Sequence, residues 1–153
     1  MSSPAFTVSQ AHWLRNRSLL RSIRESVFVI EQRVPKELEW DDLDASALHV
    51  VATDNAGNGI GTGRLTVDGQ IGRMAVLADW RNQGVGSALL SRLIELAHTH
   101  NRLPLFLNAQ ERAIPFYLQH GFHCVGETFF EADIPHRRME LTAAPPKTRQ
   151  EPV

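Results

Sequence analysis

The sequence predicts a mixed α/β fold, a sheet flanked by helices. Apolar residues recur at helical spacing in separate stretches, and short apolar runs bounded by glycine, proline or asparagine recur between them. With 153 residues, 42% of them hydrophobic, the chain is long enough for one domain with a real core. We predict a single domain over residues 1–142, followed by a polar, proline-rich tail over 143–153 that we expect to be disordered.

The first half of the chain predicts one helix and four strands. A short strand is expected over 5–9, and a helix over 18–30 on the apolar stripe Leu19, Leu20, Ile23, Val27 and Ile30. Pro35 ends the helical region, and an acidic loop follows over 36–44. Three further strands are expected over 47–54, 60–68 and 71–78, joined by the turns "NAGNG" and "GQ".

The second half predicts a long helix, a strand, a short helix and a strand pair. The long helix follows "DWRNQG", with an apolar stripe of Val85, Leu89, Leu93, Leu96, Ala97 and His100. A buried strand is expected over 103–109, and a short helix within "ERAIPFYLQHGF", where Pro115 fits only the first turn and Gly121 the C-terminal cap. Strands over 123–131 and 136–142 complete the pattern.

Bulk properties argue against two classes of partner. Sixteen basic and seventeen acidic residues give a net charge of −1, so we expect no nucleic-acid partner. No apolar run reaches membrane-spanning length, and we expect no membrane association. The single cysteine, Cys124, allows no intrachain disulfide, which fits a soluble cytoplasmic protein.

The stretch "RNQGVGSALL", Arg81–Leu90, places two glycines where a turn becomes a helix. Helix N-termini present unpaired N–H groups and partial positive charge, so this junction suits a phosphate. Tight packing alone also explains two glycines. A nucleotide-triphosphate loop needs a lysine after its second glycine, and the dinucleotide fingerprint needs Gly or Ala where Leu89 stands. The other glycine cluster, "GNGIGTG" over 57–63, indicates hairpin turns.

Four segments in order resemble the GCN5-related N-acetyltransferase (GNAT) family: "RMAV", "RNQGVG", "LFLN" and "FYLQHGF". The flanks "VFVIEQRVP", "LNAQ…AIPFY" and "E-x-x-IPH…M" are similar to its small bacterial subgroup called ElaA-like or YjcF-like. The resemblance implies a mostly antiparallel, twisted sheet flanked by helices. It also implies an N-acetyltransferase, an acyltransferase transferring groups other than aminoacyl groups, in which an amine attacks acetyl-CoA directly.

The resemblance also implies which residues hold coenzyme A. The pyrophosphate would contact the loop residues Arg81, Asn82, Gln83, Gly84, Val85, Gly86 and Ser87. The backbone of Met74, Ala75 and Val76 would pair with the pantetheine arm, and the Val76 N–H would polarise the thioester carbonyl. Asn108 either bonds the same arm or serves as a strand-end turn residue.

The chemistry needs an acid for the leaving thiolate and a base for the amine. Tyr117, the only tyrosine, falls on the family's general-acid position; its alternative is an ordinary helix aromatic. Glu31 and His136 are the base candidates carried forward, and Asp41, Asp44 and His49 are others that spacing does not separate. We expect no metal, because the seven histidines lack a ligand signature.

The acceptor is expected to be a small-molecule or peptide amine, and the chain a monomer or homodimer. An alternative function is a non-catalytic acyl-CoA-binding or regulatory module with the same fold. The only tyrosine at the acid position favours the enzyme, because a pure binder needs no acid.

Overall fold

The computed structural model describes residues 5–36 and 41–141 of the chain. It divides into two compact units, Met1–Leu103 and Pro104–Val153, called here the N-terminal unit and the C-terminal unit. The sequence predicts one domain across both. The expected disordered tail over 143–153 and the acidic residues at 37 and 39 lie outside the described residues.

The N-terminal unit contains a four-stranded antiparallel sheet in the order β1-β2-β3-β4. Its elements follow the predicted order: β1 Phe6–Ala11, α1 Trp13–Arg24, β2 Leu48–Asp54, β3 Gly59–Leu65, β4 Gln70–Val76 and α3 Val85–Thr99. The first helix begins five residues before the expected Ser18 and continues as a π-helix, η1, over Glu25–Glu31. A short 3₁₀ turn that the sequence did not predict, η2 Ala78–Trp80, precedes the glycine loop.

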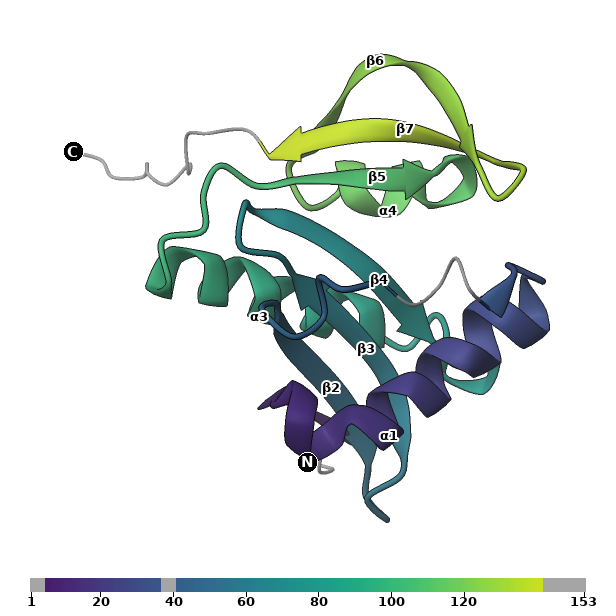
Figure 1. Ribbon diagram of the computed structural model, residues 1–153, viewed down its shortest axis with the longest axis vertical. Coiled ribbons are helices and arrows are strands. Elements are labelled where there is room, and N and C mark those ends of the chain that lie inside the picture. Colours follow the sequence, from purple (N-terminus) through teal and green to yellow (C-terminus); the bar gives the residue numbers. More distant parts are fainter. Residues whose placement is uncertain (1–4, 37–40, 142–153) are drawn as a thin grey trace. The chain divides into compact units, whose positions relative to one another are not determined.

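Helices α1 and α3 cover opposite faces of this sheet, one in front of β2 and β3 and one behind (Figure 1). The glycines of β3 show how closely both helices approach the sheet. A Cβ built on Gly59 would lie 2.7 Å from Leu19 in α1, whereas one built on Gly61 would lie 3.0 Å from Leu89 in α3. A β-bulge opposite Ala52 and Thr53 turns these glycines to different faces. The "GNGIGTG" cluster therefore serves helix packing as well as the turn that we predicted.

Apolar burial against α1 anchors the start of the unit. Leu20, Ile23 and Val27 recur at helical spacing and are buried with Val51 and Ala75 of the sheet. Behind the sheet, α3 buries its predicted stripe, including Leu89, Leu93 and Leu96. Both helices thus form because their apolar stripes are removed from water, and together they fix β4 and the loop that follows it.

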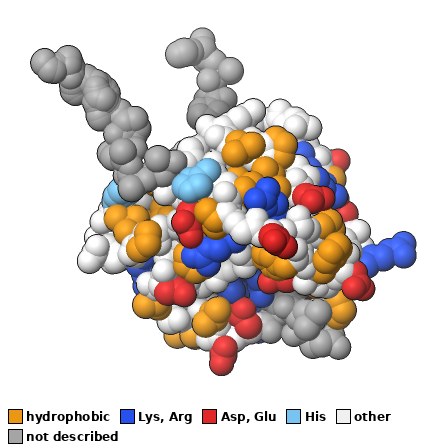
Figure 2. Space-filling model, turned by 90° about the horizontal axis from the view of Figure 1, so that it is seen from above, with side chains coloured by type: hydrophobic (Ala, Val, Ile, Leu, Met, Phe, Trp, Pro, Cys, Tyr) orange, Lys and Arg blue, Asp and Glu red, His pale blue; other side chains and the backbone are white. Residues whose placement is uncertain are grey.

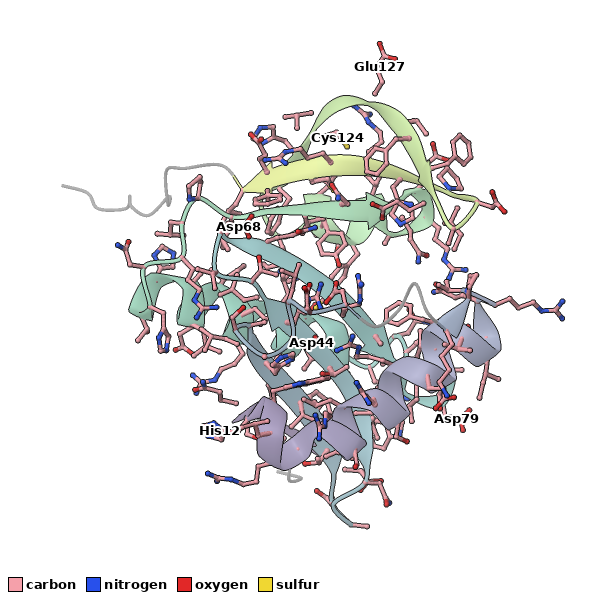
Figure 3. All side chains as sticks on the ribbon, viewed as in Figure 1. His12, Asp44, Asp68, Asp79, Cys124 and Glu127 are labelled. Carbon is pink, nitrogen blue, oxygen red and sulfur yellow. The ribbon has the colours of Figure 1, made fainter. Side chains whose placement is uncertain are left out.

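The C-terminal unit is a three-stranded antiparallel sheet in the order β5-β7-β6 with one short helix. Its elements are β5 Phe106–Gln110, η3 Glu111–Ala113, α4 Ile114–Leu118, β6 Phe122–Glu131 and β7 Ile134–Leu141. Pro115 lies in the first turn of α4, and Gly121 takes a positive φ of 92° after the helix, as predicted. β6 arches at a bulge, with Glu127 pointing outward from the arch (Figures 1 and 3).

The strand register shows which residues lie on each face of this smaller sheet. Leu107 pairs with Met139, and both are buried, whereas the next pair, Asn108 and Arg138, points to the other face. The predicted fold class, a mixed α/β fold with a mostly antiparallel sheet and flanking helices, is confirmed: all strand pairs within the two units are antiparallel.

Candidate active site

The predicted phosphate loop ends in a glycine that takes a left-handed backbone conformation. Gly84 is the residue before α3, with φ of 88°, and Asn82 has φ of 63°. A Cβ added to Gly84 would meet no atom within 4 Å, so there is open space beside this residue. No side chain caps the helix, and its first turn carries no acidic residue. The amides at the start of α3 are therefore suited to an anion.

Arg81 ties this loop to two other elements of the N-terminal unit. Its Nε donates to the Val76 carbonyl at 2.9 Å, and its two terminal nitrogens donate to the Glu31 carboxylate at 2.6 Å each. The hydrogen bonds to Glu31 raise the pKa of Arg81. Two predicted site residues are thus brought together, with Arg81 holding the loop between β4 and η1. Glu31 is engaged as an ion-pair partner.

Strand β4 contains a bulge directly before the predicted pantetheine-binding residues. Its register with β3 shifts by one residue between Thr62 and Arg64, and Arg73, opposite this point, has φ of 51°. Farther along, the Leu77 N–H donates to Ile60 of β3 at 2.9 Å. Because N–H directions alternate along a strand, the Val76 N–H points to the side of β4 away from β3. That direction is required for a donor to a bound thioester.

The described part of the acidic loop is bound into a network of arginines on the α1 face of the sheet. Arg24 and Arg64 each donate to Asp44, both at 2.9 Å in their shortest contacts. Arg64 also forms a two-bond pair with Asp41 at 2.8 Å, and Arg73 reaches the same carboxylate at 3.1 Å. Asp44, labelled in Figure 3, lies among the side chains between α1 and the sheet. Asp41 and Asp44, two of the base candidates, therefore serve as structural ion-pair partners.

Their pKa values follow from the arginines. The hydrogen bond from Arg64 lowers the pKa of Asp41 to about 2. Burial alone raises the pKa of Asp44, but the hydrogen bonds and charges of Arg24 and Arg64 outweigh it and hold that pKa below its ordinary value. Both side chains are ionised at neutral pH.

His49, the remaining base candidate of this unit, is enclosed. Its side chain is buried, its ring stacks on Trp13 with centroids 5.1 Å apart, and its Nε2 lies 2.9 Å from the Asp44 carbonyl. Burial lowers the pKa of His49.

In the C-terminal unit, Tyr117 is a buried residue of α4. Its ring packs edge-on against Phe116 and Phe122, with centroids 5.0 and 5.9 Å apart. Burial raises the pKa of its phenol, which keeps the proton at neutral pH. Phe122 pairs with Leu141, so Tyr117 lies against the face of the small sheet that also carries Met139.

Asn108 and His136 lie on the other face of that small sheet. Asn108 is half-buried opposite Arg138, and His136 is opposite Gln110. The His136 Nδ1 lies 2.7 Å from the Ile134 carbonyl, its ring stacks on Phe129 with centroids 5.8 Å apart, and its Nε2 is 3.8 Å from the Glu131 carboxylate. Glu131 is the glutamate of the segment "E-x-x-IPH…M", but no role was predicted for it from the sequence. Its neighbours Ala132 and Asp133 form a two-residue turn with positive φ, a pairing that lacks the usual Asn-Gly signal.

Other features of the described residues limit the chemistry. Within these ranges, no three His, Cys, Asp or Glu side chains gather as a metal site would require. No helix there is long and apolar enough to cross a membrane. Acidic and basic side chains are interspersed over the described residues on the face shown in Figure 2, so no extended area of that face carries a single sign of charge.

Comparison with known proteins agrees with the fold. A family model described as "Acetyltransferase (GNAT) domain" matches residues 17–143. The uncharacterized N-acetyltransferase YjcF of Bacillus subtilis is 38% identical over 76% of this chain and 86% of that relative. Protein ElaA of Escherichia coli is 32% identical over 76% and 81%, respectively. An acyl-CoA N-acyltransferase structure from Pseudomonas aeruginosa has a TM-score of 0.79 and 29% identity, covering 90% of this chain and 99% of that one.

The family model and the named relatives support an acyltransferase, and the chain belongs to the GNAT acetyltransferase family. The resemblance to the YjcF-like and ElaA-like proteins, predicted from short motifs, is confirmed over most of the chain.

Proposed function

We propose that this protein transfers an acetyl group from acetyl-CoA to a primary amine, which attacks the thioester directly. One observation of the structure carries the proposal: Gly84 is left-handed, the space beside it is open, and no side chain caps the helix that follows. In a chain of this family, such a loop is suited to the pyrophosphate of coenzyme A. The group is a co-substrate, and we propose no metal.

In this proposal the N-terminal unit binds the co-substrate. The amides from Gly84 to Ser87 hold the pyrophosphate, with Asn82 and Gln83 exposed beside them. Arg81 acts mainly by fixing the loop, since three of the five N–H groups of a guanidinium are already donated to Val76 and Glu31. The backbone of Met74 to Val76 pairs with the pantetheine arm, and the Val76 N–H polarises the carbonyl.

The C-terminal unit supplies the proton for the leaving group. Tyr117 is protonated at neutral pH, as an ordinary phenol is, and burial raises its pKa further, so it has a proton to give to the thiolate. Asn108 is a further donor for the pantetheine arm. The acceptor amine must itself lose a proton, because an alkylammonium has a pKa of about 10.4. Glu31 and His136 are the candidates for that step.

The test is thiol release from acetyl-CoA with a panel of small and peptide amines, together with calorimetric binding of coenzyme A. Gly86→Glu should abolish coenzyme A binding, because it places bulk and negative charge at the helix start. Ser91→Glu adds the same charge at an exposed position of α3 and should leave binding unchanged. Retained affinity in Gly86→Glu would refute the loop assignment.

A second variant addresses catalysis. Tyr117→Phe should lower turnover while leaving coenzyme A affinity nearly intact, since only the proton donor is lost. Unchanged turnover would remove Tyr117 from the mechanism. Tight coenzyme A binding without thiol release on any amine would instead support a non-catalytic acyl-CoA-binding module.

A further inference from the structure

Strand β4 has one residue more than its partner β3 just before the segment proposed to bind the pantetheine arm. Thr62 of β3 pairs with Ala75 of β4, but Arg64 pairs with Gly72. Between these two pairs β3 has a single residue, whereas β4 has two, at positions 73 and 74. The extra residue shifts every later residue of β4 by one position against β3.

This bulge determines the direction of the Val76 N–H. Before the bulge, the Thr66 N–H donates to the Gln70 carbonyl at 2.9 Å, which sets the alternation of bonded and unbonded pairs in that half of the ladder. Continued without an extra residue, the alternation would pair Val76 with Ile60 and turn the Val76 N–H toward β3. In the structure the N–H of the next residue, Leu77, donates to Ile60 instead. The Val76 N–H therefore points away from β3 because β4 is bulged.

The bulge requires an unfavourable backbone conformation of Arg73, whose φ is 51°. A residue with a β-carbon takes this left-handed conformation only when other contacts hold it. The Arg73 side chain supplies one such contact, because its Nη2 donates to the Asp41 carboxylate at 3.1 Å. Arg64 of β3 donates two 2.8 Å hydrogen bonds to the same carboxylate. Asp41 thus ties the left-handed residue of β4 to the neighbouring strand.

Buried ion pairs fix the position of Arg64. Its guanidinium also donates to Asp44 at 2.9 Å, and Arg24 of α1 donates to that carboxylate at 2.9 and 3.2 Å. These three side chains are at most 5% exposed, and separating buried charges of this kind is strongly unfavourable. The carboxylate that Arg73 contacts is therefore held from a rigid part of the unit.

Apolar packing supports the bulge from the other face of the sheet. A Cβ built on Gly63, the β3 residue opposite the bulge, would lie 2.6 Å from the Met74 sulfur and 2.9 Å from Leu93 of α3. The Met74 side chain thus fills the space that this glycine leaves. The arginines and aspartates lie on the α1 face, so their contacts can be removed without changing the packing against α3.

We propose that Asp41 and Arg73 form a brace that holds the β4 bulge and thereby sets the affinity for coenzyme A. Both are positioning residues, and the inference rests on the proposed function, in which the backbone of Met74 to Val76 binds the co-substrate. The brace stabilises the register in which the Val76 N–H points away from β3. A protein that also populates the unbulged register binds less tightly, in proportion to the fraction that remains competent.

The first test is calorimetric binding of coenzyme A to the whole protein with different residues at position 73. Arg73→Ala removes the brace but keeps a β-carbon on the left-handed residue, and it should weaken binding by about 5- to 30-fold. Arg73→Gly also removes the brace, but glycine takes this conformation without that penalty, so most of the affinity should return. Wild-type affinity in Arg73→Ala, or no recovery in Arg73→Gly, would overturn the proposal.

The second test examines Asp41 in two backgrounds. Asp41→Asn should weaken coenzyme A binding when residue 73 is arginine, but by less than about twofold when it is glycine, because that backbone needs no brace. A purely structural role of Asp41 through Arg64 would weaken binding equally in both backgrounds, which would contradict the brace. Asp42→Asn removes the same charge from an exposed neighbour and should leave the affinity unchanged.

A measurement without ligand separates the brace from the proposed function. Val76 and Gly61 are directly opposite, in a pair without mutual hydrogen bonds, and such pairs bring α-carbons within about 4.5 Å. The nuclear Overhauser effect between their α-protons should be strong in wild type and in Arg73→Gly. In Arg73→Ala it should weaken in favour of one between Ala75 and Gly61, the pair expected in the unbulged register.

The outcomes distinguish the two proposals. If the Overhauser effects change as expected but wild type does not bind coenzyme A, the proposed function fails, and the brace acts on the strand register alone. If wild type binds coenzyme A and Arg73→Ala changes neither the Overhauser effects nor the affinity, the brace is overturned and the proposed function stands.

Discussion

The two units hold their charged side chains in different ways. In the N-terminal unit, Asp41 and Asp44 accept hydrogen bonds from arginines at 2.8–3.2 Å, and Asp44 is almost fully buried. In the C-terminal unit, the Glu131 carboxylate lies 3.8 Å from His136 and is largely exposed. Short contacts between buried groups fix the geometry and the ionised state of both partners, whereas Glu131 keeps most of its side chain in water. Ion pairing is therefore part of the internal packing of the N-terminal unit, whereas the pair in the C-terminal unit has one partner at the surface.

Neutralising Asp44 should have the largest effect on stability. Asp44→Asn leaves Arg24 and Arg64 buried without their shared carboxylate, and breaking such a buried pair costs about 3–5 kcal/mol. The measurement is the free energy of unfolding in urea. Asp42→Asn removes the same charge from an exposed neighbour and should change stability by less than about 0.5 kcal/mol. A loss below about 1 kcal/mol for Asp44→Asn would mean that the network is dispensable.

Acid should weaken the same unit through Asp41. Its folded pKa of about 2 lies below the ordinary value of 3.8, so its contribution is complete above about pH 5 and is lost as the pH falls toward 2. The contribution is about 1–2 kcal/mol after allowance for a side chain that is 30% exposed. Unfolding free energies measured from pH 6 to 2 should fall less steeply in Asp41→Asn. Parallel curves for the two proteins would contradict the pairing.

The fold was predictable where the local spacing of apolar residues determines it, whereas the network of arginines and aspartates in the N-terminal unit was not. Apolar stripes located α3, and the F-Y-x-x-x-G-F segment located α4 and its glycine cap. The stripe from Leu19 missed the first turn of α1, which begins at Trp13. Its other residues are the polar Arg15 and Asn16 and Leu14, which is 83% exposed, so the turn shows no apolar stripe. The Arg24–Asp44 contact joins residues 20 apart, and the Arg64–Asp41 contact joins residues 23 apart. Such contacts are set by tertiary packing, and no short-range pattern reports them.

Among the candidate site residues, too, local patterns were predictable from the sequence, whereas contacts between distant residues were not. The loop from Arg81 to Ser87 was predictable because its spelling reflects a local backbone requirement, seen in the positive φ of Gly84. The engagement of Glu31 by Arg81 joins residues 50 apart, and Glu131 acquires its place beside His136 through a turn of Ala132 and Asp133. Asp133 is of a residue type that tolerates a left-handed conformation, but Ala132 is not, so the pair carries no clear turn signal.

A substitution in the glycine loop before α3 should have a medium-sized effect, and another glycine of the same unit provides a matched control. Gly84→Ala places a β-carbon on a residue with φ of 88° and should cost about 1 kcal/mol of unfolding free energy, although nothing lies within 4 Å to clash. Gly72→Ala also adds a methyl group to open space, but at a residue without a positive φ, and should be neutral or slightly stabilising. Coenzyme A affinity should fall only in Gly84→Ala. Equal behaviour of the two variants would show that the left-handed conformation is not what the loop requires.

The smallest effect is expected at the exposed ion pair of the N-terminal unit, and it tests whether short distance alone makes a charge pair important. Glu31 and Arg81 meet at 2.6 Å, yet their side chains are 38% and 37% exposed, so water screens the pair. Glu31→Gln should cost less than about 1 kcal/mol in urea unfolding and should raise KM for acetyl-CoA modestly, because Arg81 then holds the loop less firmly. Because Glu31 already accepts two hydrogen bonds from Arg81, kcat should stay near its wild-type value. A large fall in kcat with KM unchanged would instead identify Glu31 as the base for the acceptor amine.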